Sequence, residues 1–252
     1  MKRILVCSDG SISAQVCGQY AAWWSGRTGC RVDLLYLTDI RQFEVPLLAD
    51  LSGSLGIQPY QNVMSQLQEL ERQKARVIEQ TSRRMFDAYD PRVELRFHHC
   101  TGLLVDALAE FEPDVDLILL GKRGERADFA SEHLGSTMER VIRASHRPCL
   151  VTSREFRDNK RVVLAYDGGA SCLGAVEFLS SGDVIKGLEL HIVFVDEGCR
   201  ETSAGEPLEE AARAFRSAGM DPVVRVLQGD VEKTIAGYVE KEGMDLLAMG
   251  AY

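Results

Sequence analysis

Short runs of apolar residues, bounded by Gly or Asp, alternate along the chain with longer stretches in which apolar residues recur every three or four positions. This alternation is typical of βαβ units, which build a parallel sheet buried between helices. Because βαβ crossovers are right-handed, the helices cover both faces of the sheet in a three-layer α/β sandwich. In the first half of the chain, the pattern predicts strands near 3–8, 31–38, 92–100, 116–120 and 148–152, and helices near 13–25, 62–89, 103–111 and 136–145.

The same pattern occurs twice. KRILVCSDGS near the start returns as KRVVLAYDGG from Lys160, and three further pairs of segments match in the same order: 32–39 with 188–196, 93–102 with 222–230, and 116–124 with 245–252. Repeated segments in a fixed order indicate duplicated structural units. We therefore predict two tandem, doubly wound, parallel-sheet domains of Rossmann-like type, over residues 1–155 and 156–252.

The two copies differ in length. The first holds 29 extra residues between its first and fourth strands, and residues 45–62 within them have the Gly, Ser and Pro content of an inserted loop. The second copy ends soon after Gly250, the first glycine of its own fourth-strand loop. An uncovered sheet face and edge would be unfavourable, so we expect a second domain that lacks its C-terminal portion. On this view the given chain forms one complete ligand site at most, in the first copy.

Composition restricts the classes of partner. Asp and Glu number 38 against 29 Lys and Arg, so the net charge of -9 opposes binding to nucleic acid or to an anionic membrane surface. The 7 cysteines are scattered and form no CxxC pair, which favours reduced thiols in the cytoplasm. No segment has the length of a membrane span or the form of a signal peptide.

A segment that follows the fourth predicted strand, LGKRGERADFASEHLGST at 120–137, combines glycine with positive charge. Gly121 and Gly124 allow backbone amides to approach a ligand closely. The sequence Gly135-Ser136-Thr137 then opens a helix, whose free N–H groups and positive dipole end favour an anion. Lys122, Arg123 and Arg126 add positive charge. The segment suits a polyphosphate, although ordinary turn glycines, a helix cap and solvated surface cations would give the same residues.

The spacing Gly121-x2-Gly124-x10-Gly135-Ser136, after DLILLG and together with an ILVCSDGS first strand, resembles the universal stress protein family. The family pattern is G-x2-G-x9-G-[ST], so this loop is one residue longer. The resemblance covers nearly the whole chain as two copies and implies an adenine nucleotide alpha hydrolase-like fold. It also implies that ATP, with Mg²⁺, binds to the first copy.

Carried over by position, the resemblance assigns the ligand contacts to three groups of residues. Asp9 and Leu37, at the ends of the first two strands, would meet the adenosine, and Cys7 and Leu120 would line the base pocket. The third group would hold ribose and phosphates: Gly121, Gly124, Gly135, Ser136 and Thr137. From their charge, and not from the resemblance, we also place Lys122 and Arg123 at this site. Asp9 could equally cap the first helix, a role open also to Ser11 and Ser13.

Other chemistries have weaker support in the sequence. GxSxG, HExxH, Walker A and GxGxxG motifs are absent from it, as are the SGGxDS and HxGH motifs of related nucleotide-dependent enzymes. His98, His99 and Cys100 are adjacent along one strand, so their side chains alternate between faces. Zinc bound by His98 and Cys100 with a distant third ligand stays an open alternative.

Three functional hypotheses follow. The first is a regulatory ATP-binding module that an unknown protein partner recognises. The second is a slow Mg²⁺-dependent ATP hydrolase, with Asp9 as the nearby carboxylate. The third is a nucleotide-free scaffold that binds a partner or an apolar ligand through residues 45–62. The family usually dimerises through its last strand, here 147–153, so we expect a homodimer or a pseudo-dimer of the two copies.

Overall fold

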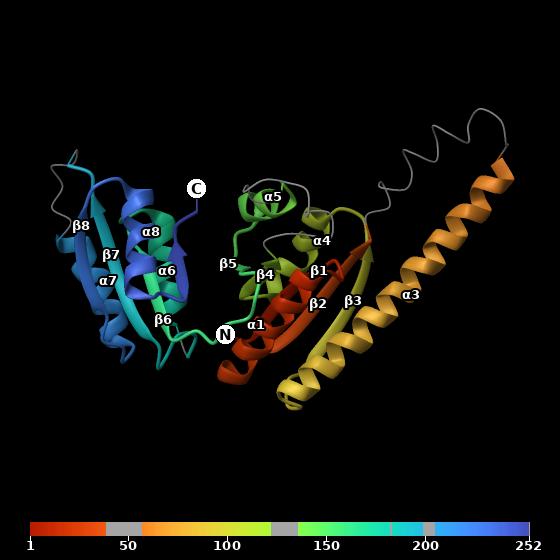
Figure 1. Ribbon diagram of the computed structural model, residues 1–252, viewed down its shortest axis with the longest axis horizontal. Helices are drawn as coiled ribbons and strands as arrows, with labels where there is room; N and C mark the ends of the chain where they lie inside the picture. The colour runs from red at the N-terminus through yellow and green to blue at the C-terminus, as the bar shows by residue number, and fades with distance from the viewer. Residues whose placement is uncertain (39–56, 122–135, 182, 199–204, 252) are drawn as a thin grey trace. The chain divides into compact units, whose positions relative to one another are not determined.

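The computed structural model of the chain describes residues 1–38, 57–121, 136–181, 183–198 and 205–251 (Figure 1). The chain divides into two compact units, which we name domain 1 (Lys2–Phe156) and domain 2 (Arg157–Tyr252). Each domain contains one parallel sheet flanked by helices. The predicted class, two tandem α/β domains, is confirmed.

Domain 1 is built on a sheet with the strand order β3-β2-β1-β4-β5. The chain first winds outward from β1 to β3 and then crosses back to β4 and β5, so the winding direction reverses between β1 and β4. In such sheets ligands bind at this reversal, beyond the carboxyl ends of the strands. The strands are β1 (Arg3–Ser8), β2 (Arg31–Thr38), β3 (Leu95–Thr101), β4 (Leu117–Gly121) and β5 (Cys149–Thr152).

Helices cover both faces of this sheet, as Figure 1 shows: α1 and α3 lie on one face, and α4 and α5 on the other. Helix α1 packs against both the sheet and the neighbouring helix α3, which explains why its buried residues, including Trp23 and Trp24, extend around the helix instead of forming one stripe. The helical segments are α1 (Ile12–Thr28), α3 (Ile57–Tyr89), α4 (Leu104–Phe111), the short 3-10 helix η1 (Glu112–Asp114) and α5 (Ser136–Ala144).

Two predicted boundaries are wrong. Helix α3 begins at Ile57, so residues 57–62 are helical and not part of a loop. Pro59 is tolerated there because the first turn of a helix needs no backbone N–H donor. Strand β3 begins at Leu95 and not near residue 92, because Asp90 holds a turn: its carbonyl accepts the Val93 amide, and its side chain accepts the Arg92 amide at 2.9 Å.

Domain 2 repeats the arrangement over four described strands, in the order β8-β7-β6-β9. Helices α6 and α7 pack together on one side, and α8 covers the apolar residues of the other face around Val163 and Val193. The elements in chain order are β6 (Arg161–Ala165), α6 (Ala170–Ser180), β7 (Glu189–Asp196), α7 (Gly205–Ser217), β8 (Val223–Gln228), α8 (Val231–Glu242) and β9 (Leu246–Met249).

The internal repeat extends to individual hydrogen bonds. In each domain, a carboxylate just before the fourth strand accepts hydrogen bonds from two successive backbone amides at the start of the first strand. The distances lie between 2.5 and 3.0 Å for Asp116 with Lys2 and Arg3, and for Asp245 with Lys160 and Arg161. Similar sequences therefore build the same long-range contact twice.

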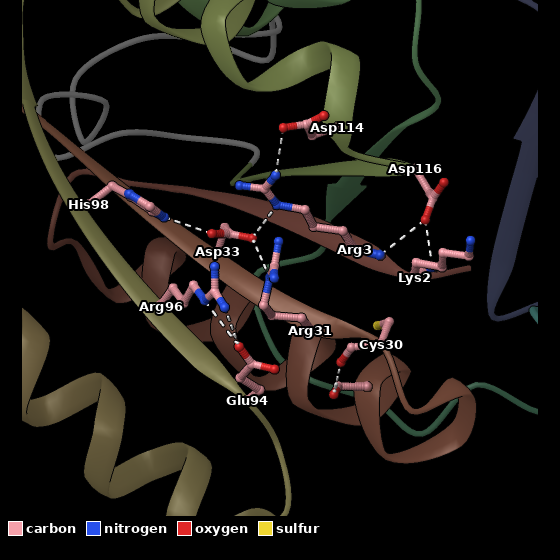
Figure 2. Close-up of polar contacts among 11 residues, drawn as sticks. Lys2, Arg3, Cys30, Arg31, Asp33, Glu94, Arg96, His98, Asp114 and Asp116 are labelled. Carbon is pink, nitrogen blue, oxygen red and sulfur yellow. Dashed lines mark hydrogen bonds and ion pairs between the residues drawn. The ribbon is translucent and has the colours of Figure 1, made fainter.

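A buried carboxylate ties three strands of domain 1 together near their amino ends (Figure 2). Asp33 is 0% exposed, and it accepts hydrogen bonds from Arg3 Nε at 2.5 Å and Arg31 Nε at 3.3 Å. Its other oxygen lies 2.6 Å from His98 Nε2. Burial alone would raise the pKa of Asp33, but the hydrogen bonds from Arg3 and His98 and the charges of both arginines lower it below its usual value. Asp33 is therefore an ionised group inside the domain.

Removal of this buried charge should destabilise domain 1. In Asp33→Asn, two arginines remain without their shared counter-charge, and we expect a loss of roughly 3 kcal/mol in the free energy of unfolding. Urea denaturation followed by circular dichroism measures this loss. Glu79→Gln is a matched control, because Glu79 forms a surface ion pair with Arg83 on the same helix face and should change stability by under about 0.5 kcal/mol. Equal effects of the two substitutions would contradict this account.

The same carboxylate predicts a pH dependence. The pKa of Asp33 is lower in the folded chain than in the unfolded chain, so its contribution is fully present above the unfolded pKa of about 3.9. It is lost as the pH falls through the folded pKa. The difference in unfolding free energy between wild type and Asp33→Asn should therefore stay constant above about pH 5 and shrink as the pH falls below about 4. A difference that does not shrink below about pH 4 would show that the ionised Asp33 carboxylate does not cause it.

Candidate functional site

The candidate site lies at the carboxyl ends of β1 and β4, the neighbouring strands between which the winding reverses. Their register pairs Val6 with Leu119, so β1 and β4 end at Ser8 and Gly121 on the same edge of the sheet. Helices α1 and α5 both begin at this edge of the sheet, as expected for right-handed units (Figure 1). The topology therefore brings two predicted site segments together.

A tight turn follows β1. Asp9 Oδ1 accepts a hydrogen bond from the Ser11 amide at 2.9 Å, and Gly10 adopts a φ of +81°, which favours glycine. The side-chain cap of α1 is Ser11, whose hydroxyl accepts the Ala14 amide at 3.2 Å. Asp9 thus shapes the turn that leads into the helix, while Ser11 is the residue that caps it. Domain 2 repeats this turn at Asp167, with Gly168 at a φ of +78°.

The predicted base-pocket residues lie on one face of the sheet. Strand alternation and register place Cys7, Leu37 and Leu120 on the face that α4 and α5 cover. Leu120 is buried at 4% exposure, whereas Cys7 and Leu37 are half-buried, as is Cys100 beside Leu37 on β3. Burial raises the pKa of the Cys7 thiol, so it is a neutral, apolar group and not a nucleophile.

The backbone of Leu37 extends past the end of β1. Odd-numbered residues of β2 bond toward β1, as Arg31 does with Lys2, and even-numbered residues bond toward β3, as Thr38 does with Gly102. The ladder with β1 ends at the pair Ser8 and Tyr36. The Gly10 amide, next in line for the Leu37 carbonyl, donates instead to Ser8 Oγ at 3.3 Å. The backbone carbonyl of Leu37 therefore points toward the space beyond the end of β1.

The glycine segment is described only at its ends. Gly121 is the last residue of β4 and pairs with Thr152 of β5, and residues 136 and 137 form the start of α5. The structure therefore brings Gly121 and the amino end of α5 to the same edge as Asp9. The other predicted phosphate contacts lie outside the described residues: Lys122, Arg123, Gly124 and Gly135.

Sequence reasoning missed a polar cluster on the opposite face of the same edge. Glu71 of α3 accepts hydrogen bonds from Tyr36 OH at 2.8 Å and from Thr38 Oγ1 at 3.0 Å, and Thr38 Oγ1 lies 2.9 Å from His99 Nε2. A cleft of about 230 Å³ opens beside these groups, with Met64 and other α3 residues on its wall. Burial lowers the pKa of His99.

A signal for this cluster was present in the sequence. Met64, Leu67, Ala75 and Ile78 follow the helical period of α3, and Glu71 is the charged residue in the middle of that apolar stripe. A carboxylate on the packed face of a helix needs hydrogen-bond donors from the surface it contacts. The hydroxyls of Tyr36 and Thr38 are those donors.

The two adjacent histidines serve different faces. His98 points to Asp33 and packs edge-on against Phe111, while His99 points to Thr38 on the α3 side. Among the residues that the structure describes, no group of three His, Cys, Asp or Glu side chains could hold a metal ion. The zinc alternative at His98 and Cys100 therefore gains no third ligand from the described chain.

A search of the described helices for a membrane span found no candidate, because none combines the required length with sufficient apolar character.

In domain 2, the end of β9 is in contact with the first turn of α6. The first turn of α6 packs onto Gly250, where an added Cβ would lie 3.1 Å from both Cys172 Sγ and Ser171 Cβ. Ser171 Oγ also donates to the Ala251 carbonyl at 3.2 Å. In the described part of domain 2, the segment after β9 therefore lies close against α6.

Comparisons with known proteins agree with this description. The universal stress protein family model matches residues 1–153. Universal stress protein Slr1230 from Synechocystis sp. is 38% identical over an alignment of 258 residues, which spans 100% of this chain and 90% of that protein.

Solved structures show the same fold across both domains. A universal stress protein from Archaeoglobus fulgidus DSM 4304 superposes with a TM-score of 0.73 at 18% identity, over 98% of this chain and 86% of that one. PA1789 from Pseudomonas aeruginosa PAO1, described as functionally unknown, gives a TM-score of 0.58 at 16% identity, over 100% of this chain and 82% of that one. Together with the family match over the first 153 residues and the 38% identity along the whole chain, the repeated sheet architecture shows that this chain belongs to the universal stress protein family.

Proposed function

We propose that domain 1 binds ATP together with Mg²⁺ at the carboxyl ends of β1, β2 and β4. Binding would serve as a regulatory signal in a stress response, which a protein partner recognises. The observation that carries the proposal is the convergence at one sheet edge of the Asp9–Gly10 turn, Gly121 and the amino end of α5.

The adenine ring would lie on apolar side chains. Cys7, Leu37 and Cys100 are half-buried on one face at the strand ends, so a flat ring could cover them and remove their remaining surface from water. The Leu37 carbonyl, which faces the space beyond β1, would accept a hydrogen bond from the amino group of adenine.

Ribose and phosphates would contact the two turns. The Asp9 carboxylate, at the end of β1, suits the hydroxyl groups of ribose. The α5 amino end, at Ser136 and Thr137, would offer the phosphates first-turn amides, which have no acceptor within a helix, and a positive dipole end. Lys122 and Arg123 add positive charge in sequence, which matters in a chain of net charge -9. Bound Mg²⁺ would neutralise part of the triphosphate charge.

The proposal is binding and not turnover. Asp9 Oδ1 already accepts the Ser11 amide, which suits a carboxylate that shapes a turn and orients a ligand. We assign the nucleotide to domain 1 because the spaced glycines of the predicted phosphate segment follow β4 in the sequence.

Thermal unfolding in the presence of Mg²⁺-ATP tests the proposal. At a ligand concentration 100 times the Kd, binding should stabilise the folded state by about 2.7 kcal/mol and raise the melting temperature. Gly124→Asp and Gly135→Asp should each abolish the shift, because an added carboxylate repels phosphate and its Cβ blocks close approach of the backbone.

A glycine outside the proposed site gives the control. Gly237 lies on α8, where an added Cβ meets no atom within 4 Å, so Gly237→Asp should keep the full ATP-dependent shift. Mass spectrometry of ligand released from the native protein identifies the nucleotide directly. A melting temperature that ATP leaves unchanged in wild type would refute the proposal.

A further inference from the structure

Helix α3 is bonded to the last residues of β2 through one carboxylate. Glu71 Oε2 accepts hydrogen bonds from the Tyr36 hydroxyl at 2.8 Å and the Thr38 hydroxyl at 3.0 Å. Tyr36 is 2% exposed and Thr38 is 7% exposed, so both donor residues are buried, while Thr38 and Glu71 also line the cleft of about 230 Å³. Hydrogen bonds to a carboxylate are stronger than hydrogen bonds between neutral groups.

Thr38 is held from a second direction as well. Its hydroxyl lies 2.9 Å from His99 Nε2, and its carbonyl accepts the Gly102 amide at 3.0 Å. Because a hydroxyl has one proton and Thr38 donates it to Glu71, the His99 Nε2 atom must be the donor to Thr38. The end of β2 is therefore fixed by a chain of directed bonds that runs from α3 to β3.

The same helix also touches the end of β1. A Cβ added at Gly10 would lie 2.7 Å from Ile78 Cδ1 and 3.7 Å from Lys74 Cε. Ile78 lies about two helical turns after Glu71 on α3. Helix α3 therefore contacts the ends of both strands that the proposed function assigns to the adenosine.

We infer that Glu71 is a positioning residue for the nucleotide base. It fixes Thr38, and Thr38 fixes the backbone of its neighbour Leu37, whose carbonyl faces the space beyond β1. The inference rests on the proposed function, since it concerns the same site. Glu71 lies on the α3 side of the sheet, so it acts through β2 and not by contact with the ligand.

Base selectivity is the property that this positioning controls. Adenine carries an amino group at the position where guanine carries a carbonyl oxygen, so a fixed backbone acceptor attracts one base and repels the other. If the end of β2 moves, ATP loses a hydrogen bond while GTP is relieved of a repulsion. A loss of Glu71 should therefore lower the ratio of ATP affinity to GTP affinity, a change that general destabilisation of the domain would not cause.

Isothermal titration calorimetry of the full chain with Mg²⁺-ATP and Mg²⁺-GTP, well below the melting temperature, tests the inference. We expect Glu71→Ala to weaken ATP binding roughly tenfold, the effect of one lost hydrogen bond to a well-placed group, and to leave GTP binding unchanged or stronger. Glu71→Gln keeps a side-chain oxygen acceptor and should restore the affinity ratio to within about threefold of wild type.

Two further variants sharpen the test. Glu79→Ala removes a carboxylate from the same helix, one that pairs with Arg83 on the surface, and should match wild type for both nucleotides. Thr38→Val removes the intermediate hydroxyl and should reproduce the effect of Glu71→Ala. The double variant should be no weaker than either single one, because both interrupt the same chain of bonds.

The outcomes separate the inference from the proposed function. If wild type binds neither nucleotide, the proposed function fails. If wild type binds ATP and Glu71→Ala keeps the wild-type ATP-to-GTP ratio, the inference alone is overturned. Should circular dichroism show that Glu71→Ala does not fold, Thr38→Val and Tyr36→Phe carry the test by the same ratio, and an unchanged ratio in both overturns the inference.

Discussion

The pairing of β1 with β4 is the contact on which the candidate site depends. Among the described residues, two strands, three α-helices and the 3-10 helix η1 lie between these strands in the sequence, so their pairing closes a long loop at a cost in chain entropy. Burial of Leu5 beside Ile118, both 0% exposed, offsets part of this cost. The Asp116 carboxylate adds hydrogen bonds to the Lys2 and Arg3 amides. Only after this pairing do the Asp9 turn and Gly121 become neighbours.

Both domains carry a polar residue at the same buried position of their second strand, with different partners. In domain 1 the residue opposite Leu5 is Asp33, bonded to two arginines and His98. In domain 2 the residue opposite Val163 is His191, which is 6% exposed and bonded to Tyr238 OH at 2.7 Å and Glu189 Oε1 at 2.9 Å. Buried polar groups must be paired, so each network permits one strand register and penalises a slip.

The strands and the repeat could be predicted from sequence because their signals are local. An apolar run such as LILL at 117–120 is buried on both faces, and the Asp-Gly dipeptide after β1 specifies a turn by its own chemistry. The residue at which α3 begins could not be predicted from the sequence, because Pro59 is compatible both with a loop and with a first helical turn. The predicted contacts at Lys122, Arg123, Gly124 and Gly135 stay predictions.

The Glu71 cluster could not be predicted in the same way. Its members lie on β2, α3 and β3, and their separations of 33 and 61 residues carry no periodic signal. The charged Glu71 on an apolar helix face indicates that hydrogen-bond donors lie opposite it. Which residues are those donors depends on how α3 crosses the sheet. Such pairings follow from tertiary packing, and local propensity does not encode them.

The buried thiols of domain 1 have a consequence for redox chemistry. Cys17 Sγ lies 3.1 Å from Thr152 Oγ1 inside the domain, and burial raises its pKa to about 12, as burial also raises the pKa of Cys7. Peroxides and alkylating agents react with thiolates, which are scarce for such groups at neutral pH. Cys17, which is 0% exposed, is therefore inert while the domain stays folded, and the rate at which a thiol reagent labels Cys17 would report how often the interior opens to solvent.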